Sequence, residues 1–454
     1  MKKVHYIRFV SLFMLILMLG SLLSPAASAQ KTALPQIENV DAFCVINTEY
    51  RQVVLEKNMS KTIYPASTVK LLTALVAEEH FRQNLNTKVS VTSQMLDAVV
   101  GRNMGLEEGE QIRIVDLLHA MLVSGYNDAA IILAFATSGS IEAFAQQMNQ
   151  KAKELGASHS NYTNPTGLHD AAMVTTAYDT ALIGLAVREN QTLFSITKTL
   201  KYTLPATNKS EDRTIYNRNP MISTSTTEEY YYSHAEGMSS GATDEGGDCV
   251  VTSGHIKSRL GADTEELPDE LSFICVVMGG KATATGDDTN YACVGTKTLL
   301  RYALVNYELQ KILSKDQRMG TVPVRFSPTE EEVNVKPQSD LYALLHIDVD
   351  VEKDIEVKIS DLPELLEAPI PEGTKAGTVQ VILDGTVIGT TDLITTASVD
   401  SHSFLIIMFY AKQITQHPVF IILLILAIGC LVYFLLKRFP IIKNKDRHKR
   451  TRYF

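Results

Sequence analysis

The sequence predicts an α+β fold: an antiparallel sheet covered by helices, followed by a small β-sandwich domain and one C-terminal transmembrane helix. Three observations support this prediction. Strand-like segments stand near residue 42 and return near residue 250, with helical segments between them, which differs from the regular alternation of a parallel sheet. Short alternating strands begin at about Val322. An uncharged apolar run of 19 residues then occupies 418–436.

The N-terminus has the pattern of a secretory signal peptide, residues 1–29. A basic stretch at 2–8 precedes an apolar run at 9–23, and the small residues 27–29 form a cleavage site. We therefore expect the mature chain to begin at Gln30.

The C-terminal run, residues 418–436, is long enough to cross the hydrocarbon core of a membrane as a helix. Eight Lys and Arg residues crowd the tail, 437–454, which places the tail on the cytoplasmic side and the body of the protein outside. A buried core helix is the other interpretation of the run, and the basic stop disfavours it. The apolar segment 404–410 is too short to span, so we expect it to lie at the membrane interface or to pack under the last domain.

The charge is unevenly divided along the chain. The leader carries +3 and the tail +7, so of the total of −9 the residues between them carry −19. A body this acidic is unsuited to binding nucleic acid or anionic lipid surfaces.

Five cysteines are present, of which Cys430 lies in the predicted membrane span. Cys44, Cys249, Cys275 and Cys293 stand in apolar, strand-like contexts, without a C-x-x-C pair or a His/Cys cluster. The sequence therefore predicts no metal site, and buried free thiols are the expected state. A Cys249–Cys275 bridge would need neighbouring strands to bring the two residues together.

The first domain is predicted to cover residues 37–305. Its opening hairpin leads into a helix that follows Ser67, and a later helix ends at Ser124-Gly125. The expected elements are, in order, strands at 42–47 and 52–56, helices at 114–123 and from Asn127, a loop at 164–168, a helix at 176–185, strands at 249–253 and 271–278, and a helix at 292–304.

The second domain, residues 318–398, is predicted to be a β domain with no cluster of titratable side chains. Asp384-Gly385 is a two-residue hairpin signal. We interpret this domain as a stalk or spacer. The expected strands are 333–336, 341–345, 355–359, 378–383 and 386–390.

Ser67 and Lys70 form the motif around which we interpret the function. At spacing i, i+3 they share one face of a helix, so the amine can activate the hydroxyl as a nucleophile. The spacing alone is not specific, because Ser195 and Lys198 have it too. Pro65 before Ser67 and the apolar helix after it favour the first pair as a buried helix that begins at the floor of a cleft.

With these segments placed, the chain resembles the serine-type D-Ala-D-Ala carboxypeptidases, the low-molecular-mass penicillin-binding proteins of the bacterial cell envelope. The resemblance covers nearly the whole region outside the membrane. It implies a beta-lactamase/transpeptidase-like catalytic domain at 37–305, on the extracytoplasmic face of the bacterial membrane. It rests on the segments 66–70, 105–110, 127–130, 164–168, 176–179, 241–245 and 366–389.

The resemblance also implies the chemistry, which is acyl transfer on peptidoglycan stem peptides with β-lactams as acylating inhibitors and without a cofactor. Ser67 would attack the carbonyl between the two terminal D-alanines, and Lys70, as general base, would accept its proton. The backbone N–H groups of Ser67 and Ala242 would hold the oxyanion.

Two further motifs of the family are altered in this chain. The family's Ser-x-Asn supplies a proton-relaying hydroxyl and a substrate-orienting amide; here its serine position is Gly125, and Asn127 remains. Ser124 stands one residue early and is a candidate for a displaced proton relay.

The third motif of the family, Lys-Thr-Gly on an inner strand, supplies a cation for the substrate's terminal carboxylate. This chain has Ser239-Ser240-Gly241 there, followed by Ala242, so we expect these four residues to bind substrate without that cation. Ser240 keeps the hydroxyl and Gly241 keeps the close approach of the backbone. Lys257, Arg259 and His234 are the candidates to replace the missing charge.

Two functions follow from these observations. One is a membrane-anchored carboxypeptidase, weakened or retuned toward another acyl-peptide substrate. The other is a non-catalytic relative that binds peptidoglycan or a cell-envelope partner. A β-lactamase is a weaker third interpretation, because no E-x-x-L-N segment occupies the loop at 164–168.

Overall fold

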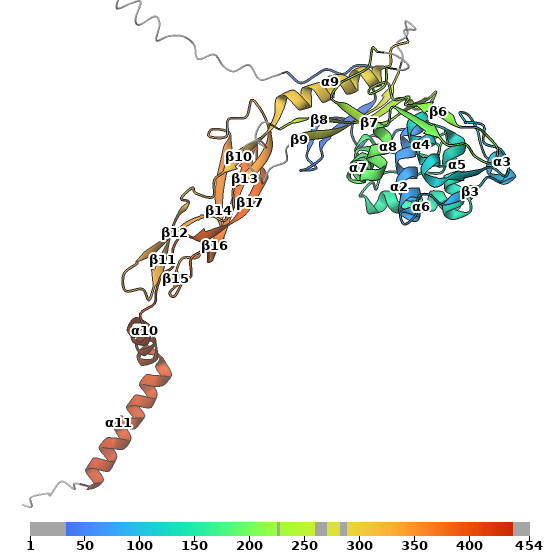
Figure 1. Ribbon diagram of the computed structural model, residues 1–454. Coiled ribbons are helices and arrows are strands. Elements are labelled where there is room, and N and C mark those ends of the chain that lie inside the picture. Colours follow the sequence, from blue (N-terminus) through green and yellow to red (C-terminus); the bar gives the residue numbers. More distant parts are fainter. Residues whose placement is uncertain (1–32, 225–227, 259–269, 282–287, 439–454) are drawn as a thin grey trace, which may run out of the picture. The chain divides into compact units, whose positions relative to one another are not determined.

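The computed structural model describes residues 33–224, 228–258, 270–281 and 288–438 (Figure 1). The predicted signal peptide, most of the basic tail and Arg259 lie outside these ranges. The chain divides into two compact units, which we describe separately. The first runs to Gln310 and includes Leu344–Asp350, and the second comprises Lys311–Ala343 and the chain from Val351 onward.

The main sheet of the first unit is antiparallel, as predicted, with strand order β2-β1-β9-β8-β7 (Figure 1). The early hairpin joins the late strands because β1 pairs with β9. The two segments predicted as neighbouring buried strands are β8 and β9, and they do pair. The strands are β1 (Ala42–Asn47), β2 (Val53–Lys57), β7 (Ala235–Thr243), β8 (Gly247–Lys257) and β9 (Glu270–Gly280).

Side chains alternate across each strand, and apolar residues point to both faces of this sheet. Helices therefore cover both faces. On β1, Cys44 and Ile46 pack into a core shared with helices α2 to α8, whereas Phe43 and Val45 pack into a core shared with α9. The helices are η1 (Ala66–Val69), α2 (Lys70–Phe81), α3 (Ser93–Asp97), α4 (Ile114–Ser124), α5 (Asn127–Ser138), α6 (Ile141–Glu154), α7 (Ala177–Glu189), α8 (Gln191–Lys198) and α9 (Tyr291–Asn306).

Strand β7 carries the segment Ser239–Ala242 and lies at the edge of the sheet. This corrects the inner-strand position that the resemblance implied. An edge strand keeps one row of backbone N–H and C=O groups free of partners within the sheet, so it can accept an added peptide strand. Two strand pairs were not predicted: β3 (Lys88–Ser90) with β4 (Gln111–Arg113), and β5 (Lys201–Leu204) with β6 (Arg213–Tyr216).

The second unit is a β domain, as predicted. Its main sheet has the order β14-β16-β17-β12-β11-β15. Strands β10 and β13 form a separate pair, and each begins in one unit and ends in the other. Asp384 and Gly385, both at positive φ (49° and 78°), make the predicted two-residue turn. Gly389 on β17 approaches Ile312 and Leu341 of the separate pair, so the two sheets face each other there. The strands are β10 (Tyr307–Leu313), β11 (Gly320–Arg325), β12 (Glu332–Pro337), β13 (Leu341–His346), β14 (Ile355–Ser360), β15 (Leu366–Glu367), β16 (Lys375–Leu383) and β17 (Thr386–Thr395).

Two helices end the described chain, α10 (Ser403–Gln416) and α11 (Pro418–Arg438). The apolar segment 404–410 lies in α10, and it packs on the β domain through Phe409, whose ring centroid is 5.2 Å from that of Phe326. In α11, residues 418–435 have a mean hydropathy of 2.9 and none of this stretch is buried. This helix is therefore long and apolar enough to cross a membrane, as the sequence predicted.

Cys44, Cys249, Cys275 and Cys293, which lie outside α11, are buried free thiols. Strands β8 and β9 are neighbours, but Cys249 packs into the core on the α2 side of the sheet and Cys275 into the core on the α9 side. A Cys249–Cys275 bridge is excluded because the two side chains point to opposite faces. Burial raises the pKa of the Cys44, Cys249 and Cys293 thiols to about 12, which makes them unreactive in the folded protein.

This arrangement predicts that the four buried cysteines are reduced. When the full-length protein is unfolded without a reductant and treated with a maleimide, we expect labelling at Cys44, Cys249, Cys275 and Cys293 in peptide mass mapping. A sample reduced beforehand should give the same labelling. Two of these residues left unlabelled until reductant is added would contradict the prediction.

Candidate active site

Ser67 and Lys70 are brought together at the junction of two helical segments. Ser67 lies in the short helix η1, and α2 begins at Lys70, so both side chains lie on one helical turn. The Lys70 amine donates a hydrogen bond to the Ser67 hydroxyl at 3.0 Å. Thr68 steadies the turn by donating its hydroxyl to the Pro65 carbonyl at 2.6 Å. The pair predicted from sequence is therefore present with the geometry of a nucleophile and its base.

The Lys70 amine is buried, since only 2% of the residue's surface is exposed to solvent. It donates a second hydrogen bond to the Thr166 carbonyl at 2.6 Å. Desolvation by burial lowers the pKa of Lys70 from 10.5 to about 7. A substantial fraction of the amine is thus neutral near pH 7 and able to accept a proton.

The loop at 164–168 closes over this amine. The Asn164 side-chain oxygen accepts hydrogen bonds from the backbone N–H of Thr166 at 3.1 Å and of Gly167 at 3.0 Å, which fixes the turn. Gly167 has φ +83°, and a Cβ there would lie 1.9 Å from the Ala66 carbonyl oxygen. Only glycine allows the loop to approach the Ser67 turn this closely.

Strand β7 approaches the nucleophile from the other side. A Cβ on Gly241 would lie 2.4 Å from the Ser67 Cβ and 2.9 Å from its Oγ, so this position also requires glycine. The Ser239 hydroxyl donates to the Ser67 backbone carbonyl at 3.3 Å. Ser240 and Ala242 line the same cavity.

The side chains of the second motif bond to neighbouring segments of the wall and not to Ser67. Gly125 ends α4 with φ +72°, and Ser124 donates its hydroxyl to the Tyr216 carbonyl on β6 at 2.9 Å. Asn127 donates its amide to the Val100 carbonyl at 2.8 Å and its backbone N–H to the Arg102 carbonyl at 2.7 Å. The Ser124 hydroxyl and the Asn127 amide are thus engaged away from Ser67, and their predicted roles stay predictions.

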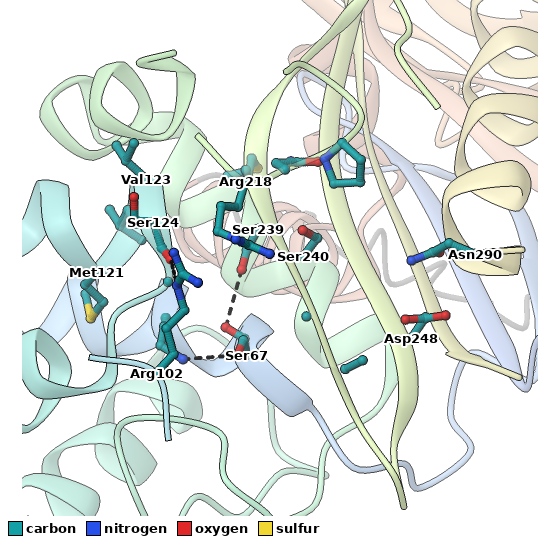
Figure 2. Close-up of a pocket in the computed structure, with 18 residues that line it drawn as sticks. Ser67, Arg102, Met121, Val123, Ser124, Arg218, Ser239, Ser240, Asp248 and Asn290 are labelled. Carbon is teal, nitrogen blue, oxygen red and sulfur yellow. Dashed lines mark hydrogen bonds between the residues drawn. The ribbon is translucent and has the colours of Figure 1, made fainter. Parts of the chain in front are cut away.

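These segments enclose a cavity of about 430 Å³ over Ser67 (Figure 2). Two of the lining residues are arginines, Arg102 and Arg218. They were not predicted from the sequence, because neither lies in a recognised motif. Of the residues proposed to replace the missing cation, His234 and Lys257 are absent from the described lining. The lining residues are Ser67, Lys70, Arg102, Met121–Gly125, Arg218–Pro220, Met238–Ala242, Asp248 and Asn290.

The second Ser-x-x-Lys pair has no such setting. Ser195 and Lys198 are exposed on α8, and the Lys198 amine donates to Glu236 at 3.2 Å. The lysine also lies over the Phe194 ring, 4.4 Å from its centroid. This pair is part of a surface ion-pair group, as the sequence context indicated.

Comparison with known families and proteins agrees with this site. The family described as D-alanyl-D-alanine carboxypeptidase matches residues 28–262, and the penicillin-binding protein 5 C-terminal domain matches residues 307–401. The D-alanyl-D-alanine carboxypeptidase DacF of Bacillus subtilis is 27% identical over 349 residues, which cover 76% of this chain and 82% of DacF. The D-alanyl-D-alanine endopeptidase of Escherichia coli is 32% identical over 215 residues, covering 44% of this chain and 68% of the endopeptidase.

Solved structures confirm the predicted fold. Penicillin binding protein 5 from Haemophilus influenzae has a TM-score of 0.59 at 22% identity and covers 82% of this chain and 100% of its own. DacD from Francisella tularensis has a TM-score of 0.58 at 22% identity, with coverages of 84% and 99%.

The contact between β7 and Ser67 predicts the effect of a single methyl group. Gly241→Ala should lower the rate at which a fluorescent penicillin labels the full-length protein by at least about a hundredfold, because the added Cβ displaces Ser67. The melting temperature of the variant should confirm that it folds. A folded variant that is labelled at the wild-type rate would show that the close approach has no role.

The lowered pKa of Lys70 predicts a pH dependence. Labelling should rise about tenfold per pH unit below pH 7 and level off above it, as the amine loses its proton. Between about pH 7 and 10.5 the Lys70 amine is protonated in the unfolded chain and neutral in the folded protein. The unfolding free energy of the wild type should therefore rise with pH over this range when it is compared with that of Lys70→Met, which lacks the amine. A labelling rate that is flat from pH 5 to 9 would contradict a lysine base.

Proposed function

The chain belongs to the D-alanyl-D-alanine carboxypeptidase family, and we propose that it is a serine-type carboxypeptidase that removes the terminal D-Ala of peptidoglycan stem peptides. The observation that carries this proposal is the buried Lys70 amine, 3.0 Å from the Ser67 hydroxyl and at the floor of an open cavity. Peptides that end in D-Ala-D-Ala are the substrate class that the family name supplies.

The first step is attack by Ser67 on the carbonyl between the two D-alanines. The neutral Lys70 amine keeps one N–H on the Thr166 carbonyl and takes the Ser67 proton with its lone pair. The serine oxygen forms the new C–O bond, and the negative charge moves to the former carbonyl oxygen. N–H groups of Ser67 and Ala242 would receive this oxyanion, with β7 holding the substrate as an added strand.

The second step releases D-Ala and leaves an ester on Ser67. Collapse of the tetrahedral centre breaks the C–N bond, and the departing amine takes the proton held by Lys70. Water then attacks the ester with Lys70 as base, which returns the free serine and the shortened peptide. Lys70 can make both transfers, and Ser124 need not act while its hydroxyl is bonded to Tyr216.

The altered motifs support a weakened or retuned version of this activity. Losing a charge-assisted hydrogen bond to the substrate carboxylate costs about 1.5–3 kcal/mol, or roughly tenfold to a hundredfold in rate, if nothing replaces it. The same alterations favour the alternative of a non-catalytic relative that binds peptidoglycan or an envelope partner. Gly167 and Gly241 favour the catalytic proposal, because the close approaches that they allow hold two segments against the turn that carries Ser67.

We further propose that the protein acts on the extracytoplasmic face of the bacterial membrane, after removal of residues 1–29. Helix α11 would anchor it, with the basic residues 437–454 in the cytoplasm. The β domain would act as a spacer between membrane and active site.

The proposed activity predicts turnover that depends on Ser67. The full-length protein in detergent should release D-Ala from diacyl-L-Lys-D-Ala-D-Ala, and Ser67→Ala should release none above background. The exposed pair offers a matched control, because Ser195→Ala should keep the wild-type rate. No D-Ala release by a folded wild type, together with retained binding to peptidoglycan, would establish the non-catalytic alternative.

A further inference from the structure

The active-site cavity is lined by two guanidinium groups, those of Arg102 and Arg218 (Figure 2). Among the described residues, no carboxylate pairs with either arginine. The rest of the chain outside the membrane is strongly acidic, so unpaired cations at this place are conspicuous. A cation that lines a cavity without an acidic partner is a candidate to bind an anionic group of a ligand.

Asp248 is the acidic residue of the lining, and it points to the other side of the sheet. A Cβ on Gly280 would lie 3.2 Å from the Asp248 Cβ and 2.9 Å from the backbone N of Ala292, the second residue of α9. After burial, the charge of Asp248 is the second cause that raises the pKa of the Cys293 thiol on the same helix, so Asp248 lies beside α9. Burial also raises the pKa of the Asp248 carboxyl. This carboxylate therefore does not neutralise the arginines above Ser67.

Arg102 is held in a defined position, whereas among the described residues no hydrogen bond, ion pair or cation–π contact holds the Arg218 side chain. The Arg102 Nε donates to the Ser124 carbonyl at 2.9 Å, and the guanidinium carbon lies 4.9 Å from the centroid of the Tyr126 ring. The Arg102 carbonyl accepts the Asn127 backbone N–H at 2.7 Å. The second motif thus holds Arg102 by hydrogen bonds on both its backbone and its side chain.

This anchoring leaves the outer end of the guanidinium available. The hydrogen bond uses Nε alone, so the two Nη groups remain free of partners within the described structure. Gly125 adds no side chain to this part of the wall, and the position of its absent Cβ has nothing within 4 Å. An arginine fixed at Nε presents a planar edge that can grip a carboxylate through two parallel hydrogen bonds.

We propose that Arg102 binds the terminal carboxylate of the substrate in place of the lysine missing at Ser239. This inference rests on the proposed carboxypeptidase function and names the residue that recognises the free C-terminus. It also gives Asn127 and Ser124 a role in this chain: they position Arg102.

The test compares two peptides that differ only in the charge of the C-terminus, diacyl-L-Lys-D-Ala-D-Ala and its C-terminal amide. The full-length wild type should prefer the acid. Arg102→Gln should lower kcat/KM for the acid by roughly tenfold to a hundredfold and leave kcat/KM for the amide within about threefold. Arg102→Lys should keep part of the preference, since it keeps the charge.

Two further variants make the result specific. Arg218→Gln removes the other guanidinium of the same cavity and should retain the preference for the acid. Arg102→Gln combined with Ser239→Lys should regain that preference, because it restores a cation where the family has one. Equal losses on both peptides in Arg102→Gln, or loss of the preference in Arg218→Gln alone, would overturn the proposal.

A binding measurement separates this proposal from the proposed function. In the Ser67→Ala background, calorimetry with the same two peptides needs no catalysis. The acid should bind more tightly than the amide, and adding Arg102→Gln should remove the difference. If the wild type has no turnover but this difference is found and depends on Arg102, the proposed activity fails and the carboxylate site stands. If both peptides bind Ser67→Ala equally, the carboxylate site fails.

Discussion

Burial of the Lys70 amine beneath the Ser67 hydroxyl is the interaction on which the rest of the site depends. An amine in water would hold its proton at neutral pH, and it accepts one here because desolvation lowers its pKa to about 7. Segments far apart in sequence create that environment: the start of α2, the loop at 164–168 and strand β7. Gly167 and Gly241 are needed because a side chain at either position would hold these segments apart.

The altered motifs change how charge is distributed in the cavity, and the residues at these positions make structural contacts. Ser239 still contacts the turn that carries Ser67, through its hydroxyl, and Gly125 still ends α4 in the left-handed conformation. What differs is the origin of the positive charge, which now comes from Arg102 on the loop between α3 and β4. Recognition of a carboxylate requires a cation at a suitable place, and several segments around one cavity can provide it.

Much of this could be predicted from the sequence, because the signals were periodic or motif-based. Short apolar runs predicted β1, β8 and β9, and a longer uncharged apolar run predicted α11. Arg102 was missed because a loop arginine has no periodic signal, and its role depends on contacts with Ser124 and Tyr126 that form only in the folded chain. The edge position of β7 was missed for a similar reason, since strand order is decided by tertiary pairing.

The central claim is that Ser67 is a live nucleophile, and trapping the covalent intermediate tests it most directly. Full-length protein is incubated with benzylpenicillin, quenched in acid, and examined by intact mass and by peptide mapping. The account predicts an added mass of one penicillin per chain, located on Ser67 and absent from Lys70→Met over the same short incubation. A folded wild type that remains unmodified at saturating penicillin, or an adduct on another residue, would contradict it.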